Sequence, residues 1–130
     1  MYEELKELND LIKRKQERID ELRTMATSLS APIGSIHVQT THEDRLANLM
    51  CKIVIAENEL DEIIDDFADK KRKAQNEIFM LPNQDWQDIM YMHYIEFKPM
   101  EEIAEIKKKS VGSMYAKNNR AIKHLKKQLT

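Results

Sequence analysis

The amino-acid sequence predicts an all-α protein in which a long N-terminal helical hairpin or coiled coil precedes a domain of three shorter helices. Three observations lead to this fold class. Glycine and proline are scarce, with 2 and 3 residues in a chain of 130. Charged residues make up 34% of the chain and aromatic residues 6%, a composition typical of long solvated helices around a modest core. Apolar residues recur at helical spacing along most of the sequence.

Residues 2–29 and 43–80 are predicted as two long helices. In each, apolar residues alternate three and four positions apart as in a coiled-coil heptad, and in the first helix only Lys15 interrupts the stripe. Such narrow stripes need a partner helix, so the helices either fold back on each other or pair between two chains as a homodimer. The predicted coiled-coil interface consists of Leu5, Leu8, Ile12, Ile19, Leu22, Leu46, Leu49, Ile53, Leu60, Ile63 and Phe67.

The chain is expected to divide into two domains, residues 1–80 and residues 81–130. Within the first, a linker is expected at about residues 30–42, because Pro32, Gly34 and several Ser and Thr residues interrupt the helical pattern there.

Residues 81–130 are predicted as three helices. Asn83 is the expected N-cap of the first, Pro99 fits the first turn of the second, and Ser110 is the expected N-cap of the third. A short second helix joined to the third by a tight turn predicts a helix-turn-helix domain. The expected inward side chains are Trp86, Ile89, Met90, His93 and Tyr94 on the first helix, and Met114, Ala121, Ile122, Leu125 and Leu129 on the third.

The charge distribution is uneven although the net charge is only −2. Residues 107–130 contain eight of the 21 Lys and Arg residues and none of the 23 Asp and Glu residues. A basic segment on an acidic body indicates a polyanionic partner.

The residues of the three-helix part resemble region 4 of bacterial sigma-70-type factors. There the pattern runs Leu-Pro, an apolar stripe, Tyr, Glu-Ile-Ala, Ser-x-x-Thr-Val, then Arg-Ala-Leu-x-x-Leu. The matching positions are Leu81, Pro82, Ile89, Tyr94, Glu102, Ile103, Ala104, Ser110, Ser113, Met114, Arg120, Ala121, Ile122 and Leu125.

Nearly the whole chain is similar to a family of short phage and prophage proteins from Gram-positive bacteria, mostly without an assigned function. Those proteins carry an "LR-x-x-AT-S" segment, here "LRTMATSLSA", before a sigma-like module. The family is related to small phage activators of late transcription, of the ArpU and RinA kind. The resemblance implies a sigma region 4-like fold and a DNA-binding regulator of late genes, with host RNA polymerase as a further partner.

The turn "IKKKS" departs from the sigma-like pattern, which has an apolar residue at 107, Gly or a small polar residue at 108 and an apolar residue at 109. Lys107 and Lys109 are expected to lay their methylene groups along the core and to direct their ammonium groups outward. Lys108 in place of glycine costs about 1 kcal/mol if its backbone is left-handed.

In the usual docking of a helix-turn-helix, the first turns of the second helix enter the major groove of double-stranded DNA. Asn119 is suited to adenine, and Val111 or Ala116 to a thymine methyl group. With about five phosphates engaged, binding should fall with salt at a log–log slope of about −4.5. The expected base-facing residues are Ser110, Val111, Gly112, Tyr115, Ala116 and Asn119, and the expected phosphate contacts are Lys107, Lys108, Lys109, Lys117, Arg120 and Lys123.

Other functional classes find little support in the sequence. Cys51 is the single cysteine and has no metal-ligand spacing with a histidine, so neither a metal site nor a cofactor is expected. No phosphate loop or nucleophile elbow is present, so no catalytic residue is assigned and an enzyme is not expected. No apolar run approaches the ~20 residues of a membrane span, and the cytoplasm of a host bacterial cell, near the nucleoid, is the expected location.

Two alternatives to the DNA-binding regulator stay open. One is a protein-interaction factor that binds RNA polymerase or another host protein without reading DNA. The other is a packaging protein similar to small terminase subunits, which also join a helix-turn-helix to an oligomerising helical part.

Overall fold

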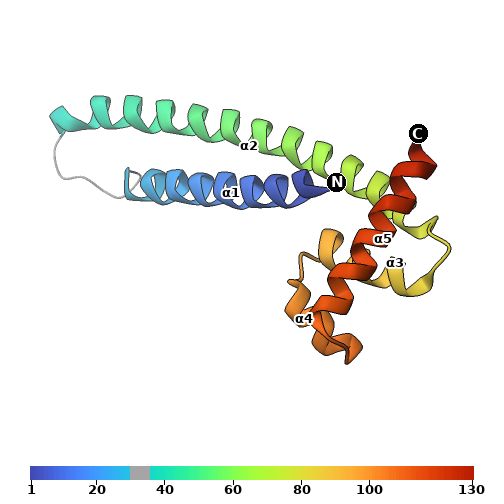
Figure 1. Ribbon diagram of the computed structural model, residues 1–130. Coiled ribbons are helices and arrows are strands. Elements are labelled where there is room, and N and C mark those ends of the chain that lie inside the picture. Colours follow the sequence, from blue (N-terminus) through green and yellow to red (C-terminus); the bar gives the residue numbers. More distant parts are fainter. Residues whose placement is uncertain (30–35) are drawn as a thin grey trace. The chain divides into compact units, whose positions relative to one another are not determined.

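The computed structural model describes residues 1–29 and 36–130, and in these ranges it contains helices and no strand, which confirms the all-α class (Figure 1). Within the described residues, no helix is long and apolar enough to cross a membrane. The elements in chain order are α1 (Glu3–Leu29), α2 (Ile36–Phe79), α3 (Gln84–Met90), the π-helix η1 (Tyr91–Ile95), α4 (Met100–Lys107) and α5 (Val111–Leu129).

The expected linker at about residues 30–42 is wrong in its second half, because α2 already begins at Ile36. The segment "IHVQTTH" lacks glycine and proline, so extending the helix through it costs only a few tenths of a kcal/mol per Thr or β-branched residue. The first half of the expected linker, with Pro32 and Gly34, lies outside the described residues.

The chain forms two compact units, and their boundaries differ from the expected division after residue 80. One unit comprises Asn9–Asp66, and the other combines Met1–Leu8 with Phe67–Thr130. Both long helices therefore contribute residues to each unit.

In the Asn9–Asp66 unit, α1 and α2 run antiparallel within one chain (Figure 1). Leu22 and Ala26 of α1 form a buried cluster with Leu49 and Ile53 of α2. Of the residues predicted for the coiled-coil interface, this unit buries Ile19, Leu22, Leu49, Ile53 and Leu60, and half-buries Ile12, Leu46 and Ile63.

The other unit draws on the beginning of α1. Leu5 is 1% exposed and belongs to a core with Ala74 and Ile78 of α2 and Leu125 of α5, whereas Leu8 and Phe67 are half-buried. The first residues of the chain therefore complete the core of the unit that contains the three short helices. The sequence does not reveal this role, because Leu5 and Leu8 continue the same heptad spacing as the residues of α1 that pack in the hairpin.

The first short helix, α3, begins as predicted at the Asn83 N-cap, whose Oδ1 accepts hydrogen bonds from the backbone N–H groups of Asp85 (2.9 Å) and Trp86 (3.3 Å). It then widens into η1, which the sequence does not predict. One sign of the wider turn is that the buried Met90 and Ile95 are five positions apart. Of the expected inward residues, Ile89 and Met90 are buried, whereas Trp86, His93 and Tyr94 are half-buried.

Pro99 is the N-cap of α4, one position before the expected first turn. On α5, Met114, Ala121 and Leu125 are buried and Ile122 is half-buried, as predicted.

The inward stripe of α5 differs from the prediction at two positions. Leu129 is 49% exposed, because it lies in the last turn of the helix, beyond the residues that pack against it. Asn118, which is not among the expected inward residues, is buried within the stripe. Its Nδ2 donates a hydrogen bond to the Tyr94 hydroxyl at 3.1 Å. The buried positions 114, 118, 121 and 125 thus keep a heptad spacing with one polar member.

Candidate nucleic-acid interface

The turn between α4 and α5 is built around a left-handed residue. Lys108 has φ 56° and ψ 44°. Its N–H donates to the Glu105 carbonyl (3.2 Å), and the N–H of Lys109 donates to the Ala104 carbonyl (3.0 Å). This pair of bonds is the Schellman arrangement that ends a helix, and its left-handed position normally holds glycine. The turn therefore keeps helix-ending geometry despite its lysines.

Lys108→Gly should stabilise the protein by up to about 1 kcal/mol. Removing the Cβ relieves the left-handed strain, and the greater freedom of glycine in the unfolded chain offsets part of the gain. Urea unfolding would measure the change. Lys109→Gly is the matched control, since Lys109 has no positive φ and should gain nothing. Equal effects of the two substitutions would contradict strain at Lys108.

The start of α5 is fixed by a cap and by the core. Ser110 is its N-cap, as predicted, and the Ser110 Oγ accepts from the N–H of Ser113 at 3.2 Å. Met114, one turn on, is 0% exposed and packs in a cluster with Ile103 of α4 and Ile89 of α3. The cap and the buried Met114 together determine which side of α5 faces outward.

The residues expected to face bases lie mostly on the outward side of α5. At about 100° per residue, positions 112, 116 and 119 lie roughly 130–170° from the centre of the buried stripe formed by 114, 118, 121 and 125, whereas position 115 lies at its flank, about 90° away. Val111 is half-buried against the cluster around Met114, and Ser110, though exposed, uses its oxygen as the cap. The exposed members are Ser110, Gly112, Tyr115, Ala116 and Asn119.

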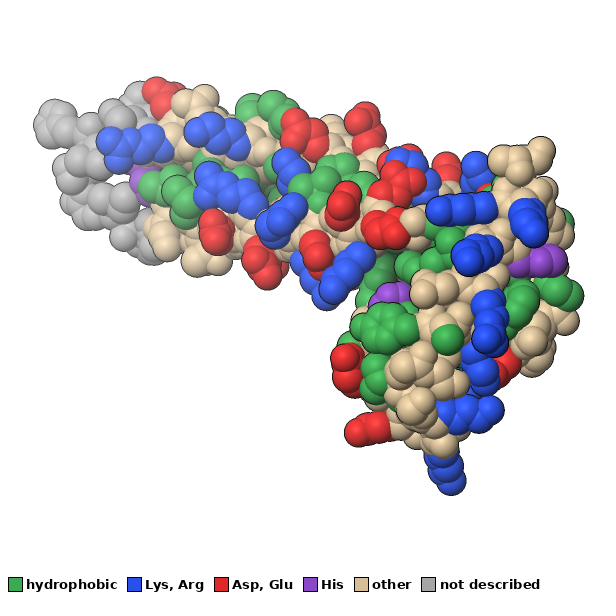
Figure 2. All heavy atoms as spheres, viewed as in Figure 1, with side chains coloured by type: hydrophobic (Ala, Val, Ile, Leu, Met, Phe, Trp, Pro, Cys, Tyr) green, Lys and Arg blue, Asp and Glu red, His purple; other side chains and the backbone are tan. Residues whose placement is uncertain are grey.

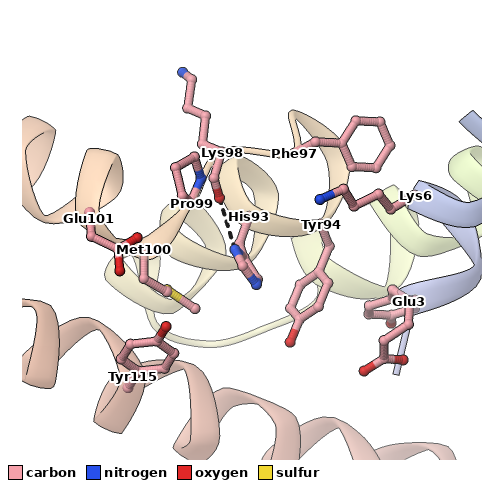
Figure 3. Close-up of a pocket in the computed structure, with 11 residues that line it drawn as sticks. Glu3, Lys6, His93, Tyr94, Phe97, Lys98, Pro99, Met100, Glu101 and Tyr115 are labelled. Carbon is pink, nitrogen blue, oxygen red and sulfur yellow. Dashed lines mark hydrogen bonds between the residues drawn. The ribbon is translucent and has the colours of Figure 1, made fainter. Parts of the chain in front are cut away.

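Tyr115 also borders a cavity of about 510 Å³. Figure 3 shows Tyr115 of α5 with Met100 and Glu101 of α4 among the residues that line it. His93 lines it as well, and its Nδ1 lies 2.9 Å from the Lys98 carbonyl oxygen. Tyr115 can therefore contact a ligand in the cavity as well as one along α5.

The phosphate candidates fall into two groups. Four of the candidates are exposed and make no ion pair within the described residues. Figure 2 shows Lys and Arg side chains in a row along the surface that α5 occupies. These four are Lys108, Lys109, Arg120 and Lys123.

Lys107 and Lys117 form the second group, because their ammonium groups are bound to carboxylates of α3. Lys107 Nζ lies 3.0 Å from Asp85 Oδ1 and 2.7 Å from Asp88 Oδ2, and Lys117 Nζ lies 2.5 Å from Asp85 Oδ2. The expectation that Lys107 directs its ammonium group outward is therefore wrong, and Lys109 is exposed rather than laid along the core. We call Asp85, Asp88, Lys107 and Lys117 the ion-pair cluster.

The ion-pair cluster shifts the titration of its members. Hydrogen bonds from Lys117 and then Lys107 hold the pKa of Asp85 below its ordinary value, and the bond from Lys107 does the same for the pKa of Asp88. Partial burial alone would lower the pKa of Lys107, but its bonds to Asp88 and Asp85 outweigh burial and raise it. All four groups are therefore charged at neutral pH.

Acid should destabilise the protein partly through this cluster. Because the pKa values of Asp85 and Asp88 are lower in the folded chain, their contribution to stability is present above the ordinary Asp pKa of about 3.9 and is lost as pH falls through the folded values. Between pH 5 and pH 2, roughly the range of that loss, the unfolding temperature should fall more steeply for the wild type than for Asp85→Asn with Asp88→Asn. Parallel curves in thermal unfolding monitored by circular dichroism would contradict this.

Sequence reasoning did not find Asp85, Asp88 or Asn118 as parts of the site. The sequence contains one signal for the two aspartates. Lys107 stands where the sigma-like pattern has an apolar residue, and a partly buried lysine needs a carboxylate nearby to compensate its charge. The buried Asn118 is visible only as a polar residue within the stripe, and its Oδ1 has no hydrogen-bond partner in the described residues.

The described residues contain no group of three or more His, Cys, Asp or Glu that could hold a metal ion. Cys51 is exposed and not disulfide-bonded. The site thus consists of a capped helix, an exposed polar face and cations.

Comparison with known proteins identifies a family. No curated protein and no solved structure matches the chain. A family model matches residues 27–126, a range that begins near the end of α1 and includes all of α2, α3 and α4 and most of α5. The chain therefore belongs to the family described as "Protein of unknown function (DUF1492)".

Proposed function

We propose that the protein is a phage-type transcriptional regulator that binds double-stranded DNA through α4 and α5 and activates late genes. The observation that carries the proposal is the outward face of α5, where Gly112, Ala116 and Asn119 are exposed opposite the buried stripe. Of the four cations without ion pairs, Lys108 and Lys109 lie in the turn before this face, and Arg120 and Lys123 follow it along α5. The likeness to sigma region 4 and to activators of the ArpU and RinA kind supports the same reading.

The binding mode follows from side-chain chemistry. With the first turns of α5 in the major groove, Asn119 can form two hydrogen bonds to adenine and Ala116 can contact a thymine methyl group. Gly112 has no atom within 4 Å of the position of a Cβ, so it presents an open stretch of backbone to the DNA. Arginine, which makes the commonest contact to guanine, is absent from these positions, so sequence discrimination should be modest.

The ion-pair cluster lowers the expected number of phosphate contacts. With Lys107 and Lys117 neutralised, Lys108, Lys109, Arg120 and Lys123 are the remaining cations, and four contacts give a log–log salt slope of about −3.6.

Selection of bound fragments from the source genome at ~150 mM salt tests the proposal. A selected fragment should bind more tightly than a random duplex of equal length, and Asn119→Ala should reduce that preference by about 5- to 150-fold, the equivalent of one adenine contact. Equal affinity of the wild type for selected and random duplexes would refute sequence reading.

The N-terminal helices are proposed to dimerise the protein. Within the Asn9–Asp66 unit, α2 exposes Met50 and Val54 on the same side as Ala47 and Cys51, away from the buried cluster. Light scattering should therefore give a dimer mass, and Val54→Asp should give the monomer mass. A ring of many subunits would favour a packaging protein instead.

A second candidate function, binding of host RNA polymerase without reading DNA, is favoured by one surface. Phe79, Met80 and Ile106 are each at least half exposed, and two of them border an open groove of about 440 Å³. If this function holds, polymerase subunits should be retained by the wild type after nuclease treatment and lost with Phe79→Ser and Ile106→Ser, while DNA affinity stays unchanged.

A further inference from the structure

We propose that Asp85 is a positioning residue of the interface: it holds Lys107 and Lys117 away from DNA phosphates, so that the basic segment engages four phosphates and not six. This inference rests on the proposed function and adds to it a control over how strongly the protein binds DNA of any sequence.

The geometry places one carboxylate between three helices. Asp85 lies in the first turn of α3, and its Oδ1 and Oδ2 each bind a different lysine, Lys107 at the end of α4 and Lys117 in the second turn of α5. Asp88, one turn further along α3, binds Lys107 as well. Asp85 therefore connects the two helices of the helix-turn-helix to α3.

The ion-pair cluster carries no net charge, since two lysines face two aspartates. Its lysine side chains are only 20–21% exposed, unlike the four outward cations. The salt dependence of DNA binding counts the phosphates that cations neutralise. A lysine already neutralised by an aspartate adds nothing to that count unless its ion pair breaks.

The same bonds orient α5. Lys117 lies between Ala116 and the buried Asn118, so its bond to Asp85 adds a further contact that holds α5 in the orientation set by the Ser110 cap and Met114. Loss of Asp85 should therefore have two effects: it should release the Lys117 ammonium group, and it should loosen the side of α5 that carries Ala116 and Asn119. Affinity for random DNA should rise while the preference for a selected site falls.

The test is a graded series of neutral variants with salt-dependent binding to a random duplex. Asp85→Asn frees Lys117 and leaves Lys107 with Asp88, so the log–log slope should steepen by about 0.9, or about 5-fold tighter binding at 0.15 M salt. Asp85→Asn with Asp88→Asn frees both lysines, and the slope should steepen by about 1.8, or about 30-fold.

Matched controls separate this effect from a change of overall charge. Glu102 and Glu105 are exposed on α4 and make no ion pair within the described residues. Glu105→Gln, and Glu102→Gln with Glu105→Gln, change the net charge by the same amounts but free no lysine, so the slope should stay at the wild-type value. Equal steepening in both series would overturn the proposal.

A second arm does not depend on whether the aspartate variants fold. Lys107→Met with Lys117→Met in the otherwise unchanged chain removes two cations that contact no phosphate, so the slope should not change. A decrease of about 1.8 would overturn the proposal. If the wild type binds no duplex at all, the proposed function fails; if it binds and the slopes stay equal across the aspartate series, only the role of Asp85 fails.

Discussion

Replacement of Lys109 and Lys123 together by alanine should weaken binding to a random duplex about 30-fold at ~0.15 M salt. Both side chains are exposed and make no ion pair within the described residues, so each is free to neutralise one phosphate. Loss of two contacts removes about 1.8 from the log–log salt slope. Fluorescence anisotropy of a labelled duplex between ~50 and ~300 mM salt would measure both quantities.

Lys13→Ala with Lys52→Ala is the matched control, because both lysines are exposed on α1 and α2 in the Asn9–Asp66 unit and the net charge changes equally. This pair should leave the slope unchanged. If it weakened binding as much as the Lys109 and Lys123 pair, the net charge and not the position of these two lysines would govern affinity.

The second large effect concerns stability. Met114→Ala should lower the free energy of unfolding by about 2–5 kcal/mol, because Met114 is 0% exposed and its truncation leaves a cavity among Ile89, Met100 and Ile103. Urea unfolding followed by the fluorescence of Trp86, the single tryptophan, would report on this unit.

Leu129→Ala on the same helix is the natural comparison. Leu129 is 49% exposed, so its truncation should change stability by less than about 0.5 kcal/mol, although its spacing places it on the expected inward stripe. Similar losses at both positions would show that the end of α5 is packed against something in solution.

Local features were well predicted from the sequence. Asn83 and Ser110 were expected as N-caps and both act as caps, because a cap needs only a side-chain oxygen and an N–H two or three residues further on. The heptad stripes likewise predicted the pairing of the long helices. The cost expected for Lys108 depends on a left-handed backbone at this position, and its φ of 56° meets that condition.

Features that depend on distant residues were not predicted. Lys117 meets Asp85 across 32 positions and Lys107 meets Asp88 across 19, and no local pattern identifies which of 23 acidic residues will be the partner. The wide turn of η1 was not predicted either; its flanking residues Met90 and Ile95 belong to a core that includes Leu5 and Leu125, which are distant in the sequence.

The unit that contains α3, α4 and α5 is built from two separate segments, Met1–Leu8 and Phe67–Thr130, and this affects the order in which the two units fold during synthesis. Residues 9–66 are contiguous, so that unit can form as soon as its own residues have emerged. Leu5 shares a core with Leu125, which emerges about 120 residues later, or roughly 6–24 s at typical elongation rates of about 5–20 residues per second. The unit that contains α3, α4 and α5 therefore acquires its complete core last, after residues 9–66 have had time to fold.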